Sequence, residues 1–362
     1  MTAVRERDDV GGGPVAGGAA GGPETVAVST GPGAGRAGAG SGAGAAGLGG
    51  SGDPRARASA GPGAAEAHPA AAAGPGAAGP GAAGDQEVDW LYARIYCGGG
   101  DDTDALLPGI ARWVDEARAD WPVRSVHFLR FVDLRGHHVR LRLQADPDAL
   151  DELFERLDVL DATARRARVR VLERLVLDPM TAAGGTDGRA GVACSVYGPE
   201  YDKYGGPAGV EEAERHFDVS SRWCLDNRVW TAPRPLPRVA LAARFLAHAA
   251  AVGELPPAEL LGAHLRMWGS RLPERLRDGA ALSAVVRQVL ECRLEEAPGW
   301  ARADEPIKRL ADDAGRTVRR IGAGPGGRRA LDVLHMDANR FGVNPAEECV
   351  AGVCARYLLG AG

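Results

Sequence analysis

The chain has 362 residues, a formal net charge of −5 and an isoelectric point near 6.0. Because it has no overall positive field, we expect no direct nucleic-acid partner. The N-terminal MTAVRERDDV is charged and precedes no apolar run, and no stretch approaches the roughly 18 apolar residues that span a membrane. We therefore expect a cytoplasmic protein that contacts no membrane.

The first quarter of the chain differs in composition from the rest. Residues 1–84 are almost entirely Gly, Ala, Pro and Ser, as in HPAAAAGPGAAGPGAAG, whereas all seven tryptophans lie at or beyond Trp90. A segment with so few large apolar side chains cannot bury enough surface to offset the entropy lost on ordering. We predict a disordered tail over 1–84 and one folded domain over 85–362.

The start of this domain has the pattern of a strand, a helix and a hairpin. The run VDWLYARIYC (88–97) alternates well enough for a strand and ends in glycines, and 106–114 has helical spacing. Two β-rich runs follow, SVHFLRFV (125–132) and HHVRLRLQ (137–144). The intervening DLRG suits the turn of a β-hairpin.

The remaining chain is predicted to be mostly helical. An amphipathic helix is expected over 147–158 and a charged one over about 160–174, with the cluster RRARVR (165–170) on its solvated face, before a strand over 191–198. Strands that cluster early and helices that cluster late are typical of an α+β fold, here a mainly antiparallel sheet followed by a largely helical C-terminal half. The later helices, expected from Leu, Val and Ala at three- and four-residue spacing, cover 208–226, 237–252, 256–276, 280–295, 304–321, 327–341 and 344–358.

The cysteines carry no signature of metal or redox chemistry. They are scattered without a CxxC pair, so we expect buried, reduced thiols, and we expect neither a metal nor a cofactor. The six are Cys97, Cys194, Cys224, Cys292, Cys349 and Cys354.

The first polar grouping lies on the predicted strand 137–144. Val139, Leu141 and Leu143 point one way, so His138, Arg140 and Arg142 share the opposite face. Two adjacent guanidinium groups repel each other unless an anion lies between them, and a guanidinium grips a carboxylate through two parallel hydrogen bonds. The alternative is an exposed sheet face with ordinary surface arginines.

Two further groupings lie far away in the sequence. YGPEYDKYGG (197–206) crowds phenols, acids, a lysine and glycines together, and its alternative interpretation is a plain strand-to-helix connection. LHMDANRFG (334–342) places His335 and Asn339 on one helix face, and histidine is the natural proton carrier near neutral pH. A lone helical histidine is also common as a purely structural residue.

Taken in order, these segments resemble the hallmark motifs of the thiopeptide-type bacteriocin biosynthesis family, the C-terminal glutamate-elimination domain of class I lantibiotic dehydratases, here in a stand-alone form. The similarity covers about 88–358. The segments that carry it are WLYARIYCG (90–98), FLRF (128–131), HVRLRL (138–143), YGPEYDKYGG (197–206), AERHFDVSS (213–221) and LHMDANRFG (334–342).

The resemblance implies that the domain removes glutamate from glutamylated Ser or Thr, leaving dehydroalanine or dehydrobutyrine. On this basis Arg140 and Arg142 hold the glutamyl group, His335 moves the proton, and Lys203 belongs with these catalytic residues. The implied partner is a ribosomally made precursor peptide, and because the chain is too short for a glutamylation domain, we expect a separate glutamyl-tRNA-dependent glutamylation protein. The implied substrate-binding residues are Arg130, His138, Glu200, Tyr204, Asn339 and Arg340.

One departure from the family pattern leaves alternatives open. Lys203 stands where the family commonly has Arg before TyrGlyGly, and a point-charge ammonium does not reproduce a bidentate guanidinium. Some members instead join two dehydroalanines by a formal aza-[4+2] cycloaddition, making a pyridine ring. A third possibility is a non-catalytic scaffold that binds the precursor peptide.

Overall fold

The computed structural model describes residues 87–98, 101–169, 171, 173–178, 188–232, 235–294 and 304–360. The predicted tail, residues 1–84, lies outside these residues. Within them the α+β prediction is confirmed, because all the strands lie between residues 89 and 195 and the later chain is helical.

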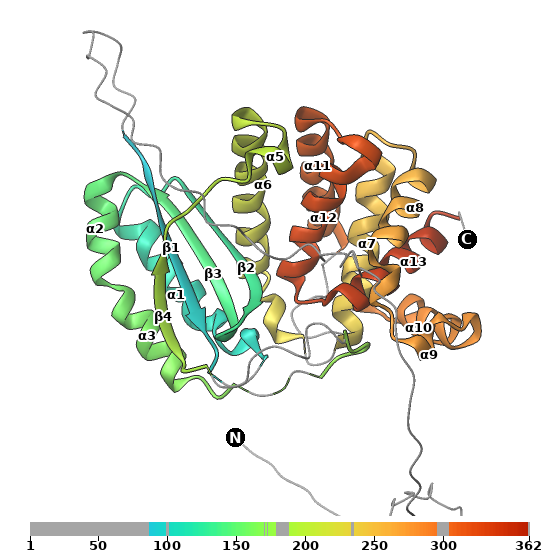
Figure 1. The fold of residues 1–362 in the computed structure, drawn as a ribbon, viewed down its shortest axis with the longest axis horizontal. Coiled ribbons are helices and arrows are strands. Elements are labelled where there is room, and N and C mark those ends of the chain that lie inside the picture. Colours follow the sequence, from blue (N-terminus) through green and yellow to red (C-terminus); the bar gives the residue numbers. More distant parts are fainter. Residues whose placement is uncertain are drawn as a thin grey trace, which may run out of the picture. The chain divides into compact units, whose positions relative to one another are not determined.

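Four strands form one antiparallel sheet in the order β2-β3-β1-β4 (Figure 1). The predicted hairpin is confirmed, since β2 and β3 pair directly with Asp133 opposite Gly136 at the turn. Strand β3 is therefore central, with β1 on its other side. The strands are β1 (Asp89–Tyr96), β2 (Ser125–Asp133), β3 (Gly136–Ala145) and β4 (Gly191–Ser195).

Alternation along β3 divides its side chains between the two faces of the sheet. Val139, Leu141 and Leu143 are at most 2% exposed and belong to the hydrophobic core, whereas Arg140 and Arg142 on the opposite face stay partly exposed. Helices α2 and α3 contact β1, α1 packs against α3, and their buried leucines join the same core. These helices are α1 (Leu107–Asp120), α2 (Pro147–Glu155) and α3 (Leu157–Arg166).

The outer edge of β2 is covered by side chains of α6 (Pro207–Asp226) and α12 (Arg328–Phe341). The backbone N–H of Val126 donates to Asp218 at 2.8 Å, and that of Phe128 to the Ser221 hydroxyl at 3.0 Å. Side chains thus satisfy edge groups that would otherwise be open to another strand. This contact joins the sheet to the helical half of the domain.

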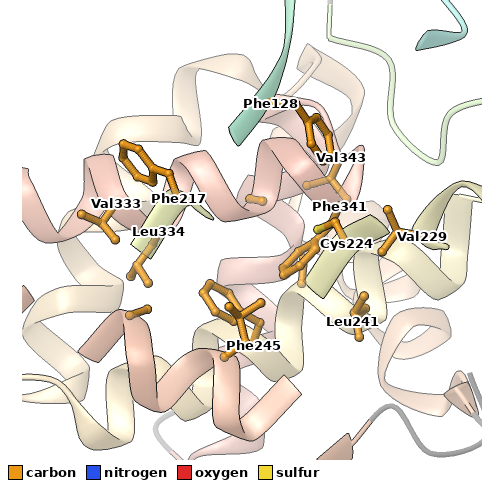
Figure 2. Packing of buried hydrophobic residues seen from close by; sticks show 14 of the residues in the cluster. Phe128, Phe217, Cys224, Val229, Leu241, Phe245, Val333, Leu334, Phe341 and Val343 are labelled. Atoms are coloured by element: carbon orange, nitrogen blue, oxygen red, sulfur yellow. The ribbon is translucent and has the colours of Figure 1, made fainter. Parts of the chain in front are cut away.

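The helical half packs around aromatic residues of α6, α7 and α12. The rings of Phe341 and Phe245 lie edge-to-face at 5.3 Å (Figure 2), and Trp223 lies 5.6 Å from Phe341. Such pairs favour one arrangement beyond the burial of apolar area. The remaining helices are α7 (Pro235–Val252), α8 (Pro257–Trp268), α9 (Glu274–Arg277), α10 (Gly279–Glu291), α11 (Asp304–Ile321) and α13 (Pro345–Leu358).

Two predicted helices are wrong in extent. The helix expected over 256–276 is interrupted, because α8 ends at Trp268 and α9 begins at Glu274 directly after Pro273, whose ring disfavours helical conformation in the preceding residue. The helix expected over about 160–174 ends at Arg166, where Ala167 is extended. The interpretation of the cluster 165–170 as a helix face therefore holds for Arg165 and Arg166, which lie in α3.

Not all of the cysteine side chains are buried. Cys97, Cys224, Cys349 and Cys354 are buried, whereas Cys194 on the edge strand β4 is exposed and Cys292 is half-buried. The expectation of burial is therefore wrong for Cys194, because an edge strand leaves one side of its chain uncovered. Among the described helices, none combines the length and apolar character needed to cross a membrane.

Candidate functional site

Three guanidinium groups project from the open face of the sheet. Arg94 on β1 is directly opposite Arg140 on β3, and Arg142 lies two residues further along the same face. Arg94 has partners, because it donates to the Ser195 hydroxyl at 3.0 Å and lies 3.7 Å from the Asp133 carboxylate. The predicted grouping of Arg140 and Arg142 on one face is thus observed, with a third arginine that the sequence analysis did not single out.

Arg142 is held between two phenol rings. Its guanidinium carbon lies 4.9 Å from the ring centre of Tyr92 and 4.6 Å from that of Tyr197, which follows β4. The Tyr197 hydroxyl donates to Glu214 on α6. These cation–π contacts orient the guanidinium, whose Nη1 also lies 3.5 Å from Nε2 of the buried His127.

Arg140 lies against the ring of Phe131, with 3.3 Å between the guanidinium carbon and the ring centre. Burial lowers the pKa of Arg140, and the nearby charges of Arg142 and Arg94 lower it further. The Nε atoms of Arg140 and Arg142 are buried without hydrogen-bond partners, and neither side chain forms an ion pair within the described part of the chain. This pair of unneutralised cations can accept an anion.

His138 shares this face, yet its side chain is fully buried. Its ring lies between Tyr96, at 4.6 Å, and Phe131, at 5.7 Å, and its Nδ1 lies 3.1 Å from the carbonyl of Gly136. Burial lowers the pKa of His138 to about 4, so the ring is neutral near pH 7. In this position the His138 ring packs against the ring of Phe131.

His335 on α12 lies at the border between protein interior and solvent. Its Nδ1 is 2.7 Å from the Glu348 carboxylate on α13, and its ring packs 4.6 Å from that of Trp268. The histidine side chain is 21% exposed, whereas Glu348 is 1% exposed. His335 lines a cavity of about 220 Å³ together with Asp101, Thr103, Arg130, Phe131, Val132, His137, Arg174, Asn339, Gly342, Val343, Asn344 and Pro345.

Phe131 joins the two predicted groupings. Its ring lines the His335 cavity and also carries the Arg140 guanidinium at 3.3 Å. Arg140 is not itself a lining residue of that cavity. Phe131 is therefore common to the cationic face and the His335 cavity, although Arg140 and His335 lie 195 positions apart in the sequence.

Asn339 and Arg340 hold α12 against the sheet edge. The Asn339 side chain accepts from the Arg130 N–H and donates to the Arg130 carbonyl, both at 2.8 Å. Arg340 is completely buried and donates to the Phe128 carbonyl and the Ser221 hydroxyl, each at 3.0 Å. Asn339 lines the cavity, whereas the donors of Arg340 face protein groups.

The Arg130 side chain is likewise engaged within the protein. Its guanidinium lies 2.6 Å from Asp104 and donates to the Thr103 hydroxyl at 2.7 Å. Asp104 also pairs with Arg238 at 2.6 Å, and these two cations hold the pKa of Asp104 down although burial by itself raises it. Arg130 thus lines the cavity as a neutralised group.

The segment YGPEYDKYGG connects β4 to α6. It forms a single helical turn, α5 (Tyr201–Tyr204), which ends at Gly205 with φ of 85°, a conformation that favours glycine. Lys203 lies 3.4 Å from Glu200, and Tyr204 is buried 5.6 Å from the ring of Phe217. The Lys203 ammonium also lies 5.3 Å from the centre of the Tyr204 ring.

Several groups at the site were not found by sequence reasoning. Phe131, Tyr197, Trp268 and Glu348 have no recognisable motif, because aromatic and acidic residues occur in any core or helix. Phe131 and Tyr197 fall inside segments that were singled out, FLRF (128–131) and YGPEYDKYGG (197–206), but the arginines that stack on them lie on β3. Among the described residues, no cluster of three or more His, Cys, Asp or Glu side chains could hold a metal ion.

The fold and site define an α+β domain with a cationic sheet face beside a histidine cavity. Residues 90–358 match the family described as lantibiotic biosynthesis dehydratase, C-terminal, and the chain belongs to this family. Its general role is therefore in the biosynthesis of ribosomally made, modified peptides. No curated protein matches the chain in sequence.

Three solved structures are similar to parts of this chain. The tRNA-dependent lantibiotic dehydratase MibB from Microbispora sp. 107891 is 20% identical, with a TM-score of 0.46 and coverage of 78% of this chain and 29% of MibB. TsrL is 15% identical, with a TM-score of 0.47 and coverage of 76% and 95%. TbtD, a pyridine synthase from thiomuracin biosynthesis, is 17% identical, with a TM-score of 0.50 and coverage of 76% and 100%. The likeness to TbtD supports the fold.

Proposed function

We propose that this protein eliminates glutamate from glutamylated Ser or Thr residues of a precursor peptide, giving dehydroalanine or dehydrobutyrine. The observation that carries the proposal is the unneutralised pair Arg140 and Arg142, which meets the His335 cavity at Phe131. An anionic group is the natural ligand of the arginines. A proton carrier beside it is what an elimination requires.

The chemistry assigns one role to each group. His335 removes the Cα proton of the glutamylated residue, the electron pair forms the Cα–Cβ double bond, and the Cβ–O bond breaks. The leaving group is the glutamate carboxylate at that oxygen, and Arg140 and Arg142 stabilise its negative charge. The proton stays on the imidazole until it is released to solvent.

The remaining predicted residues take supporting roles in this proposal. Asn339 and Arg130 line the cavity into which the peptide enters, and Arg340 acts by holding α12 in place. Lys203, Glu200 and Tyr204 belong to the turn beside the cationic face, where a substrate contact is proposed for them. His138 acts through Phe131 rather than by an exposed ring.

The partners follow from the substrate. A glutamylated peptide must be supplied by a protein that esterifies Ser or Thr, and we propose a separate glutamyl-tRNA-dependent protein for this step. MibB is described as tRNA-dependent, and the chain matches only 29% of it. Incubating the full chain with a glutamylated peptide tests the proposal by mass spectrometry. Loss of a mass equal to glutamic acid is expected, and an unchanged mass would overturn it.

A second candidate is the joining of two dehydroalanines into a pyridine ring. Lys203 favours it, because this residue is paired with Glu200 and an ammonium cannot bind a carboxylate in the bidentate manner of arginine. A leader-bearing peptide with two dehydroalanines distinguishes the candidates. Release of the leader with a pyridine-containing macrocycle supports cyclisation, and tight binding without a mass change supports a non-catalytic scaffold.

A further inference from the structure

One buried carboxylate contacts two imidazole rings next to the cavity. Glu348 on α13 lies 2.7 Å from Nδ1 of His335 on α12 and 3.3 Å from Nε2 of His264 on α8. The side chains of Glu348 and His264 are each 1% exposed. Three helices are therefore required to bring this His–Glu–His cluster together.

The position of the proton on His264 follows from its surroundings. Its Nδ1 is buried and has no hydrogen-bond partner in the described structure. A β-carbon at Gly352 would lie 2.4 Å from this nitrogen, so the glycine lets the ring approach the α13 backbone. Placing the single proton on Nε2 gives it an acceptor in Glu348, whereas a proton on Nδ1 would be a buried donor without one.

Glu348 is consequently an ionised acceptor for both rings. Burial by itself would raise the pKa of Glu348, but the positive charge of His335 or His264 whenever either ring is protonated, together with the hydrogen bonds that both rings donate, holds the pKa at about 2. An ionised carboxylate accepts hydrogen bonds and cannot donate them. The Nδ1 atom of His335 must then carry a proton.

These contacts determine whether Nε2 of His335, the second ring nitrogen, carries a proton. With its Nδ1 bonded to Glu348, a neutral His335 has an unprotonated Nε2, for which the described residues provide no hydrogen-bond partner. The Trp268 ring, tilted by 35° at 4.6 Å, limits rotation of the imidazole plane. The nitrogen able to accept a proton is therefore directed at the cavity rather than at the protein interior.

We infer that Glu348, itself held by His264, is a positioning residue that fixes His335 in the Nδ1–H tautomer and so leaves Nε2 as the base. The assignment of Nε2 as the base rests on the proposed elimination function, whereas the tautomer itself does not. Glu348→Gln reverses the hydrogen bond, because an amide can donate to Nδ1 of His335 and move the ring proton to Nε2.

The test is the tautomer of His335, measured by long-range proton–nitrogen NMR on the full chain labelled with ¹⁵N-histidine. The chain has eight histidines, and His335→Asn identifies the wanted signal by its disappearance. We expect the Nδ1–H form in the wild type when the ring is neutral. We expect the Nε2–H form in Glu348→Gln. We expect an unchanged Nδ1–H form in the matched control Glu347→Gln, because the Glu347 carboxylate accepts from the backbone N–H groups of Asn344 and Leu175 instead.

Kinetics give the second readout. We expect Glu348→Gln to lower kcat for glutamate elimination roughly 1,000-fold with KM within a few-fold, as expected of a wrong tautomer. His264→Phe, which keeps Glu348 but removes one donor, is expected to lower kcat roughly 10-fold. If Glu348→Gln fails to fold, the tautomer of His335 in the wild type and the kcat of His264→Phe test the inference instead.

The outcomes separate this inference from the proposed function. An Nε2–H tautomer in the wild type, or full elimination activity in folded Glu348→Gln, would overturn the positioning role while leaving the function intact. The expected tautomers in a protein that removes no glutamate would instead support the positioning of His335 and reject the function.

Discussion

The side-chain amide of Asn339 forms hydrogen bonds with both backbone groups of Arg130: it accepts from the N–H and donates to the carbonyl, each at 2.8 Å. Asn339 thus takes the place of a neighbouring strand at the edge of β2. Because His335 lies one helical turn before Asn339, this contact sets the distance of the histidine from the sheet. The asparagine connects the two halves of the candidate site.

Replacing Asn339 by Leu, which has a similar shape but no polar atoms, is expected to destabilise the protein by about 2 kcal/mol. The reason is that two backbone groups of Arg130 lose their partners. Urea unfolding measures the change. Asn227→Leu, which removes one hydrogen bond to the Trp223 carbonyl at the end of α6, is the control with a smaller expected loss. Equal stability of both variants would contradict the proposed bridging role.

Arg140→Met and Arg142→Met are each expected to lower kcat/KM for the glutamylated peptide by roughly 10- to 100-fold. This range corresponds to about 1.5–3 kcal/mol for a hydrogen bond to a charged group. Arg135→Met is the matched control, because Arg135 is an exposed arginine in the turn between β2 and β3, 4.0 Å from the Tyr96 ring. A loss of the same size in the control would indicate that any positive charge near the sheet promotes the reaction, rather than Arg140 and Arg142 specifically.

His335→Ala is expected to abolish turnover and to leave the fold intact. The imidazole borders a cavity, and after its removal the buried Glu348 carboxylate still has His264 as a hydrogen-bond partner. Circular dichroism and thermal unfolding check the fold, and mass spectrometry of the glutamylated peptide checks the activity. Undiminished elimination would refute the role of His335 as the base.

Substitutions of Lys203, in the turn after β4, distinguish the effect of its positive charge from the effect of the bidentate geometry that arginine has. We expect Lys203→Ala to lower the elimination rate and Lys203→Arg to maintain or raise it, because arginine adds a bidentate donor to the single charge. Rates are measured with the same glutamylated peptide. Glu200, which lies 3.4 Å from Lys203, is unchanged in both variants. Equal rates in all three proteins would show that Lys203 takes no part.

Acid is expected to destabilise the protein through His138. The pKa of this ring is about 4 in the folded state because of burial, against 6.5 for the ordinary group. As pH falls below 6.5 the unfolded chain therefore binds a proton that the folded one does not, and stability declines until about pH 4.

The size of this effect is roughly 3 kcal/mol, from about 1.4 kcal/mol per pKa unit. Urea unfolding at pH 7 and pH 5 is expected to show about 2 kcal/mol of it, because the decline continues to about pH 4. His138→Phe retains the ring packing against Tyr96 and Phe131 and is expected to lose less stability between the two pH values. An identical decline in wild type and variant would assign the acid sensitivity to other groups.

Local patterns in the sequence were sufficient for much of the fold. Alternation placed Arg140 and Arg142 on one face of a strand, and helical spacing placed His335 and Asn339 on one face of a helix, because both patterns depend only on backbone geometry within a few residues. Where local signals compete, prediction failed. Pro273 ended a helix that the apolar spacing alone would continue.

What only the tertiary structure decided is which side chains meet. Phe131 joins the arginine face to the histidine cavity, and Glu348 orients His335 from the next helix. Neither relation has a sequence signature, because a contact between distant elements depends on the packing of the whole core rather than on spacing along the chain. The sequence by itself determined the residue types of the site, and packing decided their geometry.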